Sequence, residues 1–242
     1  MDVVMISWIV GALIAVGLVA WSFTFLKKWQ IIKQTPTSNI SDLYQGAGEV
    51  EGRVVELGET LESPISRKPC VAFHFKVEQK VVRRDSDGDR RTSWRTIVDD
   101  KRGVLFGVDD GTGIAAVDPN LANLVLDREA RARSGFFSEA PSHLESTLNN
   151  QYGVSTKNWV FNKDLRFTES ILSLGEPLYV LGEVNRQSAE DPVVFSKGIV
   201  PFIVSDKSQG ALLNRFLWQA VGCWIGGVLA LVLAGFVAQS VG

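Results

Sequence analysis

The sequence contains little cysteine and histidine, with two residues of each among 242. Two cysteines cannot form a disulfide-rich scaffold. Cys70 lies in the middle of the chain and Cys223 in an apolar run near its end, so we expect them not to meet and Cys70 to be a small buried side chain. The Walker loop and the HExxH, GxSxG and paired CxxC patterns are also missing, so no catalytic or cofactor-binding motif is recognised.

An excess of either charge is missing as well, because the formal net charge is −2. All 25 basic residues lie between Lys27 and Arg215, and of the 27 acidic residues only Asp2 lies outside that stretch. The middle of the chain is therefore nearly neutral and lacks the basic surface of a typical nucleic-acid-binding protein. No nucleic-acid partner is expected.

Two long apolar runs are present, one at each end of the chain. No charged residue lies between residues 3 and 26, and the second run covers residues 217–237. Because about 20 helical residues cross the ~30 Å hydrocarbon core of a bilayer, we predict transmembrane helices over residues 1–27 and 214–239. The first run is too long for a signal peptide and has no basic segment before it.

The basic residues beside these runs predict an orientation. Lys27, Lys28 and Lys33 follow the first run, and Lys207 and Arg215 precede the second, whereas the outer ends carry no positive charge. By the positive-inside rule, the middle domain is cytoplasmic and both termini are extracytoplasmic.

Small residues spaced four apart occur in both runs. Gly222 and Gly226 form a GxxxG spacing, and Gly11 and Ala15 form a similar one. Such spacing allows helix backbones to approach closely and favours helix pairing, including a homo-oligomer through the helices. The alternative is that these glycines reflect only the ordinary frequency of glycine in membrane helices.

The middle segment is predicted as one domain over residues 38–207, composed mainly of strands. Alternating or short apolar runs bounded by turn residues cover residues 49–57, 71–77, 104–108, 114–117, 178–184 and 193–195. Helical spacing over residues 121–125 and 141–152 predicts a small helical insertion. The strand order resembles an OB-type barrel with residues 104–117 as its second and third strands. The predicted fold is a mainly β, OB-like barrel with a helical insertion, flanked by two transmembrane helices.

Three candidate sites have simpler structural explanations. Residues 85–89 resemble a calcium loop, but Arg90 and Thr96 occupy the positions that need Gly and Glu, so a hairpin tip is expected. Asp109 and the residue after it suit a tight turn better than a metal site. Cys70 and His74 would lie ~13 Å apart along a strand, too far for a nucleophile and its base. We therefore expect no catalytic residue, no metal and no cofactor.

Several segments together resemble one family. They are residues 48–52 (GEVEG), 63–73 (SPISRKPCVAF), Trp94-Arg95, 108–113 (VDDGTG), 117–119 (VDP), Glu169 and 174–183 (LGEPLYVLGE). This set is similar to the GIDE-type domain, also called the BAM ("beside a membrane") domain. The family-motif positions, expected to be structural, are Gly52, Ser63, Pro64, Pro69, Cys70, Asp109, Gly111, Gly113, Asp118, Pro119, Glu169, Gly175 and Gly182.

The resemblance implies a helix–domain–helix membrane protein related to the MULAN-type mitochondrial E3 ubiquitin ligases. Those relatives add a RING finger after the second helix, whereas this sequence stops at Gly242. A RING needs about eight Cys and His ligands for two zinc ions, so we expect the catalytic module to be absent. The relatives place the domain on the non-cytosolic side of their membrane, which conflicts with the charge argument.

Three hypotheses for function follow from these observations. The first is a membrane-anchored, non-enzymatic binding or scaffold protein whose β domain lies beside the bilayer and binds a protein or lipid partner. The second is a component of an E3-ligase-like system that acts with a separate catalytic partner. The third is OB-type binding of nucleic acid or oligosaccharide, which requires an aromatic and basic stripe on the barrel.

One loop has two competing interpretations. Residues 63–70 are expected to be structural, with Pro64 and Pro69 fixing the backbone before a strand that buries Cys70. The alternative is a binding loop in which Arg67 and Lys68 lower the pKa of a reactive Cys70 thiol.

Overall fold

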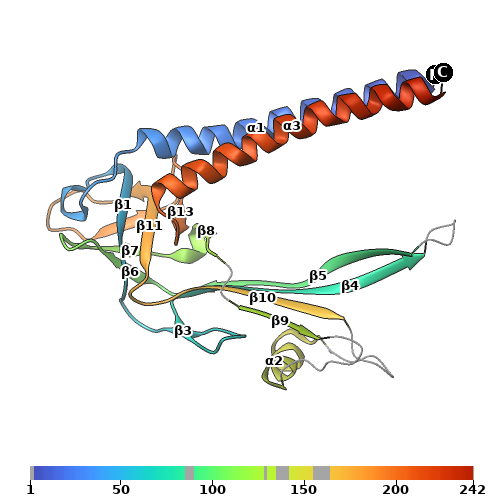
Figure 1. Ribbon diagram of the computed structural model, residues 1–242. Helices are drawn as coiled ribbons and strands as arrows, with labels where there is room; N and C mark the ends of the chain where they lie inside the picture. Colours follow the sequence, from blue (N-terminus) through green and yellow to red (C-terminus); the bar gives the residue numbers. More distant parts are fainter. Residues whose placement is uncertain (1–2, 85–89, 128–129, 135–141, 155–163, 242) are drawn as a thin grey trace. The chain divides into compact units, whose positions relative to one another are not determined.

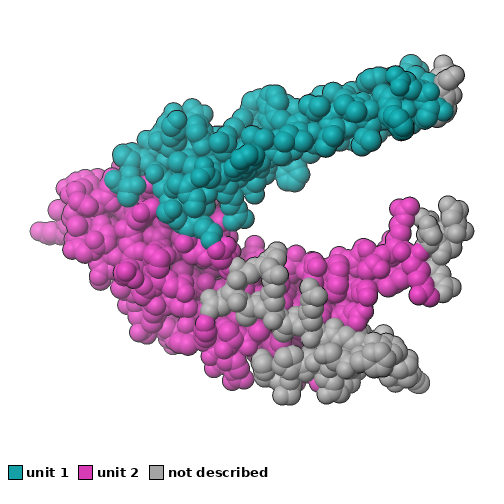
Figure 2. Space-filling model, viewed as in Figure 1, with its two compact units in different colours: residues 1–37, 207–242 teal, residues 38–206 magenta. Residues whose placement is uncertain are grey.

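The computed structural model describes residues 3–84, 90–127, 130–134, 142–154 and 164–241. The chain forms two compact units (Figure 2). One consists of residues 1–37 and 207–242, and the other of residues 38–206.

The first unit is a pair of antiparallel helices, α1 (Val3–Gln34) and α3 (Gln209–Val241) (Figure 1). Each has a mean hydropathy of 2.3 over its most apolar window and more than 30 residues. At 1.5 Å per residue, either helix is longer than the ~30 Å hydrocarbon core. Both are candidate membrane spans, which supports the prediction of a membrane protein.

The two helices approach closely at small residues. A Cβ added to Gly11 would lie 2.6 Å from the Cβ of Ala234, and one added to Gly227 would lie 3.6 Å from the Cα of Ala15. By contrast, a Cβ on Gly222 would meet none of the described atoms within 4 Å. A Cβ on Gly226 would lie 3.3 Å from the Leu18 side chain, so the intrachain contact uses Gly11, Gly226 and Gly227. Pairing through Gly222 would need a second chain.

One hydrogen bond between side chains crosses the helix pair. The Trp224 indole donates to the Ser22 hydroxyl at 3.0 Å, and that hydroxyl donates to the Val19 carbonyl at 2.6 Å. Ser22 is fully buried. Because hydrocarbon offers no hydrogen-bonding partners, satisfying this hydroxyl stabilises the pair.

The second unit contains a closed five-stranded barrel. Its strands are β1 (Gly46–Glu56), β6 (Phe106–Asp109), β7 (Ile114–Val117), β11 (Pro177–Val184) and β12 (Val193–Ser196). They pair in the closed order β1-β6-β7-β12-β11-β1, and only β7 and β12 are parallel. This is the OB-type order, so the predicted barrel and its second and third strands are confirmed.

The barrel closes because β1 pairs with two neighbouring strands. Residues 46–53 of β1 pair with β11, and residues 53–56 pair with β6. The interior holds alternate apolar residues of the five strands, including Val50, Val54, Phe106, Val108, Ala115, Val117, Val180, Val184 and Phe195, all buried.

Short elements complete the barrel's surroundings. β13 (Ile203–Ser205) pairs with β11, and β8 (Asn123–Val125) pairs in parallel with β13. Two 3-10 turns, η1 (Ile40–Asp42) and η2 (Pro119–Leu121), lie before β1 and after β7. The helix predicted over residues 121–125 is therefore wrong, since that segment is the end of η2 followed by β8.

A second sheet is inserted into the barrel sequence. It comprises β5 (Arg90–Gly103), β4 (Ala72–Arg84), β10 (Leu165–Leu172) and β9 (Ala130–Ser134), in that order. The helix α2 (Ser142–Tyr152), predicted over residues 141–152, packs on this sheet through Leu144 and Leu148. β2 (Leu61–Glu62) and β3 (Pro69–Cys70) form a small separate hairpin.

Candidate functional site

A loop between β2 and β3 is built around one buried carboxylate. Glu169, on β10, has no exposed surface and accepts hydrogen bonds from the amides of Ile65 (2.6 Å) and Ser66 (3.1 Å) and from the Ser66 hydroxyl (2.6 Å). The Ser63 hydroxyl lies 2.8 Å from that of Ser66 and accepts from the Lys68 amide at 3.1 Å. Because several donors compensate the buried charge, residues 63–68 are fixed in place. We call them the Ser63 loop.

The tip of the Ser63 loop is Arg67, which has a φ of 56°. It is the one non-glycine residue with positive φ in the described part of the chain. Such a conformation persists only where neighbouring contacts fix it, and here the Arg67 amide donates to the Ser63 carbonyl at 3.2 Å. The Arg67 side chain forms an exposed ion pair of 2.6 Å with Glu62. The loop therefore presents both charges to solvent in a defined arrangement.

Cys70 follows the loop at the end of β3 and is fully buried. Burial, and then the nearby carboxylates of Glu169 and Glu176, raise the pKa of its thiol to about 12. A reactive thiol needs exposure and a lowered pKa. Cys70 is instead buried and its thiol pKa is raised, which favours the structural interpretation of this residue.

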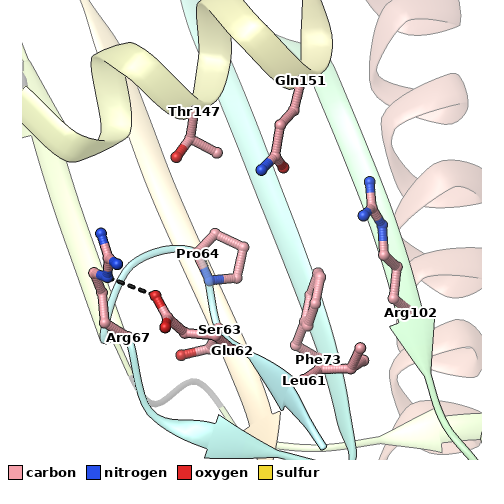
Figure 3. Close-up of a pocket in the computed structure, with 9 residues that line it drawn as sticks. All are labelled: Leu61, Glu62, Ser63, Pro64, Arg67, Phe73, Arg102, Thr147 and Gln151. Atoms are coloured by element: carbon pink, nitrogen blue, oxygen red, sulfur yellow. Dashed lines mark ion pairs between the residues drawn. The ribbon is translucent and has the colours of Figure 1, made fainter.

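The Ser63 loop forms one wall of a cleft of about 260 Å³ (Figure 3). Phe73 of β4 and Arg102 of β5 come from the sheet, and Thr147 and Gln151 of α2 point into the cleft from the opposite side. The loop side consists of Leu61, Glu62, Ser63, Pro64 and Arg67. The lining combines charged side chains with the Gln151 amide and Pro64. It suits a short polar peptide segment better than a lipid tail or a large planar cofactor.

One carboxylate links α2 to β5 beside Arg102. Asp100 accepts a hydrogen bond from the Tyr152 hydroxyl of α2 and forms an ion pair of 2.9 Å with the Arg102 guanidinium. Burial, and then the bond to Asp100, raise the pKa of Tyr152 above its ordinary value. Tyr152 therefore stays protonated and ties α2 to β5, which holds Arg102 at the cleft.

The sequence singled out Ser63 and Pro64 only as structural motif positions and Arg67 only in the binding-loop alternative. It gave no site role to the other cleft residues Phe73, Arg102, Thr147 and Gln151. The i, i+4 spacing of Thr147 and Gln151 places them on one face of the predicted helix. No pattern in the sequence indicates that this face lies opposite a loop about 80 residues earlier in the chain.

The aspartates at the β6–β7 turn accept hydrogen bonds from backbone amides. Asp110 accepts from the amides of Ile40 (2.8 Å), Thr112 (2.8 Å) and Gly113 (3.2 Å), and Asp109 accepts from the Gly111 amide (2.8 Å). Burial by itself raises the pKa of Asp110, but these donors outweigh it and hold the pKa below its usual value. A turn that also anchors η1 accounts for this motif.

Two glycines of the family motif have clear backbone roles. A Cβ on Gly52 would lie 2.6 Å from the Asp109 carbonyl oxygen, so only glycine lets β1 and β6 approach here. Gly175 has a φ of 79°, and its carbonyl accepts from the Arg53 guanidinium at 2.9 Å. These residues line an open groove of about 620 Å³ beside the barrel.

The remaining motif residues lie apart from the Ser63 cleft. Asp118 caps η2 by accepting from the Asn120 amide at 3.0 Å, and Pro119 is the first residue of that turn. Gly182 lies on β11 opposite Gly48 of β1, and Pro69 pairs with Glu62 at the start of β3. The motif is therefore spread over the fold, and only its Ser63 and Pro64 reach the cleft.

The outer face of β6 and β7 lacks the features of an OB ligand site. Neither strand contains a lysine or arginine, and their one aromatic residue, Phe106, is fully buried. OB folds bind oligonucleotides on this face through exposed aromatic and basic side chains. The nucleic-acid hypothesis gains no support from the barrel.

The described residues contain no group of three or more His, Cys, Asp or Glu that could hold a metal ion. The His74 Nε2 lies 2.6 Å from the Asp99 carboxylate on the surface of β4 and β5, whereas Cys70 is buried, so the structure does not pair His74 with Cys70 as a base and nucleophile. The hairpin tip predicted over residues 85–89 lies outside the described residues.

A comparison with protein families supplies the identity of the chain. The family model GIDE, described as E3 ubiquitin ligase, matches residues 78–238, which is more than half of the chain. The match includes the β6–β7 turn, Glu169 and the Gly175 segment, and it begins after the Ser63 loop. No curated protein and no solved structure matches the chain. The chain therefore belongs to the GIDE family, a family of E3 ubiquitin ligases.

Proposed function

We propose that this protein is a membrane-anchored binding component of a ubiquitin-ligase-like system. In this role the β domain holds a polypeptide partner, and a separate protein supplies catalysis. The family match supports the link to ubiquitin ligation, and the two candidate membrane spans support the anchorage.

The observation that carries the proposal is the fixed geometry of the Ser63 cleft. Glu169 fixes the Ser63 loop through hydrogen bonds, and the Tyr152 hydroxyl fixes α2 to β5 through Asp100. Preorganised walls reduce the entropy lost on binding. The exposed Glu62, Arg67 and Arg102 offer charges of both signs, which suits the side chains and backbone of an extended peptide.

The composition supports a binding role over a catalytic one. A RING module uses about eight Cys and His side chains to hold two zinc ions, and these 242 residues contain two of each type. The buried Cys70 thiol, with its raised pKa, is also unsuited to carrying ubiquitin as a thioester.

The proposal is tested with the purified chain in detergent, mixed with ubiquitin, an activating enzyme and a panel of conjugating enzymes. We expect no ubiquitin transfer and less than one zinc ion per chain by elemental analysis. Zinc-dependent ubiquitin transfer by the chain alone would overturn the non-enzymatic role.

A further inference from the structure

The distal part of the β4–β5 hairpin extends beyond the rest of its sheet. The ladder between β10 and β4 ends at Gln79, whereas β4 and β5 stay paired out to Arg84 and Arg90 (Figure 1). We call residues 80–84 and 90–95 the arm. Residues 90–96 of β5 are all exposed. A two-stranded ribbon in water is only marginally stable, because it buries little apolar surface. Core packing therefore does not explain why this hairpin is so long.

The arm is basic although the chain as a whole is not. Residues 80–95 contain six basic and three acidic residues, a net charge of +3 against −2 for the whole chain. The basic residues are Lys80, Arg83, Arg84, Arg90, Arg91 and Arg95. Positive charge is thus concentrated on a part of the fold that projects from the sheet.

One face of the arm combines apolar and basic side chains. Lys80 lies opposite Trp94 and Val82 lies opposite Thr92, so these four residues share a face, and Arg90 is two residues further along it. Val82 is 53% exposed and Trp94 38% exposed. Lys80 forms an ion pair of 3.1 Å with Asp164 at the base of the arm, and Arg90 lies at its distal end. Exposed Val and Trp beside cations match the chemistry of a membrane interface.

The position of Trp94 is fixed by its neighbours. The Arg166 guanidinium lies over its ring at 4.6 Å, and Arg166 is itself held by Glu78 through two bonds of 2.5 and 2.8 Å. Arg166 thus covers one side of the Trp94 ring and sets its orientation, and 38% of Trp94 stays exposed.

We propose that this face of the arm binds anionic lipid headgroups at the surface of the membrane that anchors the chain. The linkers are short, since residues 35–39 join α1 to η1 and residues 206–208 join β13 to α3. A short tether keeps the domain at the bilayer and raises the effective concentration of lipid around it. Arginines on an edge strand also prevent strand pairing between molecules, but that role does not require exposed Trp94 and Val82.

The test uses the full chain reconstituted in nanodiscs, in which both bilayer surfaces are accessible. In a Cys223→Ala background, Thr92→Cys carries an environment-sensitive dye, because the remaining Cys70 is buried. Glu59→Cys, also exposed, carries the same dye as the matched control. We expect a blue-shifted emission at residue 92, but not at residue 59, when phosphatidylserine is added to phosphatidylcholine nanodiscs, and a loss of the shift at high salt.

Charge reversal provides the second part of the experiment. Arg90→Glu should weaken the dependence on phosphatidylserine by about tenfold or more, whereas Lys101→Glu, at the base of the same strand, should leave it unchanged. An emission at residue 92 that ignores phosphatidylserine overturns the proposal. A response to polyglutamate or RNA with none to phosphatidylserine also overturns it, in favour of another polyanion.

Discussion

Glu169 and Ser66 are joined by two hydrogen bonds, one from the Ser66 amide at 3.1 Å and one from its hydroxyl at 2.6 Å. They lie 103 residues apart in the sequence and bring the loop before β3 onto β10. The family-motif glutamate thus determines the shape of a loop that forms one wall of the cleft. This relationship connects the fold to the proposed binding role.

Replacing Glu169 by Gln should loosen the Ser63 loop. In Gln, one of the two carboxylate oxygens is replaced by an NH2 group, which cannot accept the hydrogen bonds that Ile65 and Ser66 now donate. We therefore expect a loss of about 1–3 kcal/mol in the free energy of unfolding. Trypsin should cleave after Arg67 faster than in the wild type, whereas the bond after Lys68 resists trypsin because Pro69 follows it. Glu59→Gln, on an exposed residue, is the control. Equal cleavage rates in both variants would contradict the role given to Glu169.

Cys70 should behave as a buried thiol. Because its pKa is raised to about 12, its labelling by a thiol reagent should stay slow between pH 7 and 9, where an ordinary cysteine ionises. The exposed thiol of Glu59→Cys supplies the comparison. Cys70→Ala should lower the free energy of unfolding by about 1 kcal/mol, as a small core truncation does. Rapid native-state labelling, with no change in stability for Cys70→Ala, would favour the reactive-thiol interpretation.

Asp110 should contribute stability that depends on pH. Its folded pKa lies below the ordinary 3.8, so its contribution is complete above that value and is lost as pH falls through the folded pKa. Asp110→Asn should cost about 1 kcal/mol at pH 7, and the difference from the wild type should shrink below pH ~3.8. Denaturant unfolding at several pH values measures this. A difference that is unchanged at low pH would show that the charge of Asp110 is not responsible.

The topology prediction concerns the helix ends. Because Lys27, Lys28 and Lys33 lie at the C-terminal end of α1 and Lys207 precedes α3, we expect both termini on the extracytoplasmic side. Reporter fusions at Gly242 test this. A cytoplasmic signal there would contradict the positive-inside argument and match the orientation of the family's mitochondrial relatives.

The barrel could be predicted because its strands carry strong local signals. Val104, Phe106 and Val108 alternate before an Asp-rich turn, and the Gly175-Glu176-Pro177 turn precedes β11. These patterns reflect burial of one strand face, which periodicity detects. The small helix was also predictable, since α2 begins and ends within a residue of the expected range.

Other elements were hidden for physical reasons. The distal half of β5 is exposed and charged, so it shows no core periodicity. Leu121, Leu124 and Val125 have helical spacing, yet pairing with β13 makes residues 123–125 a strand. Tertiary pairing outweighed local pattern there. The cleft was hidden as well, because it depends on α2 packing opposite a loop distant in sequence.

The most direct test of the account is photo-crosslinking from the Ser63 cleft. A photoreactive amino acid replaces Gln151, which lines the cleft, or Glu59, which is exposed elsewhere, in the full chain expressed in its native membranes. We predict a discrete crosslinked polypeptide from residue 151 alone, weakened by Glu169→Gln, that is a ubiquitin-system enzyme or its substrate. Identical crosslinking from both positions, or none from residue 151, would contradict a binding role for the cleft.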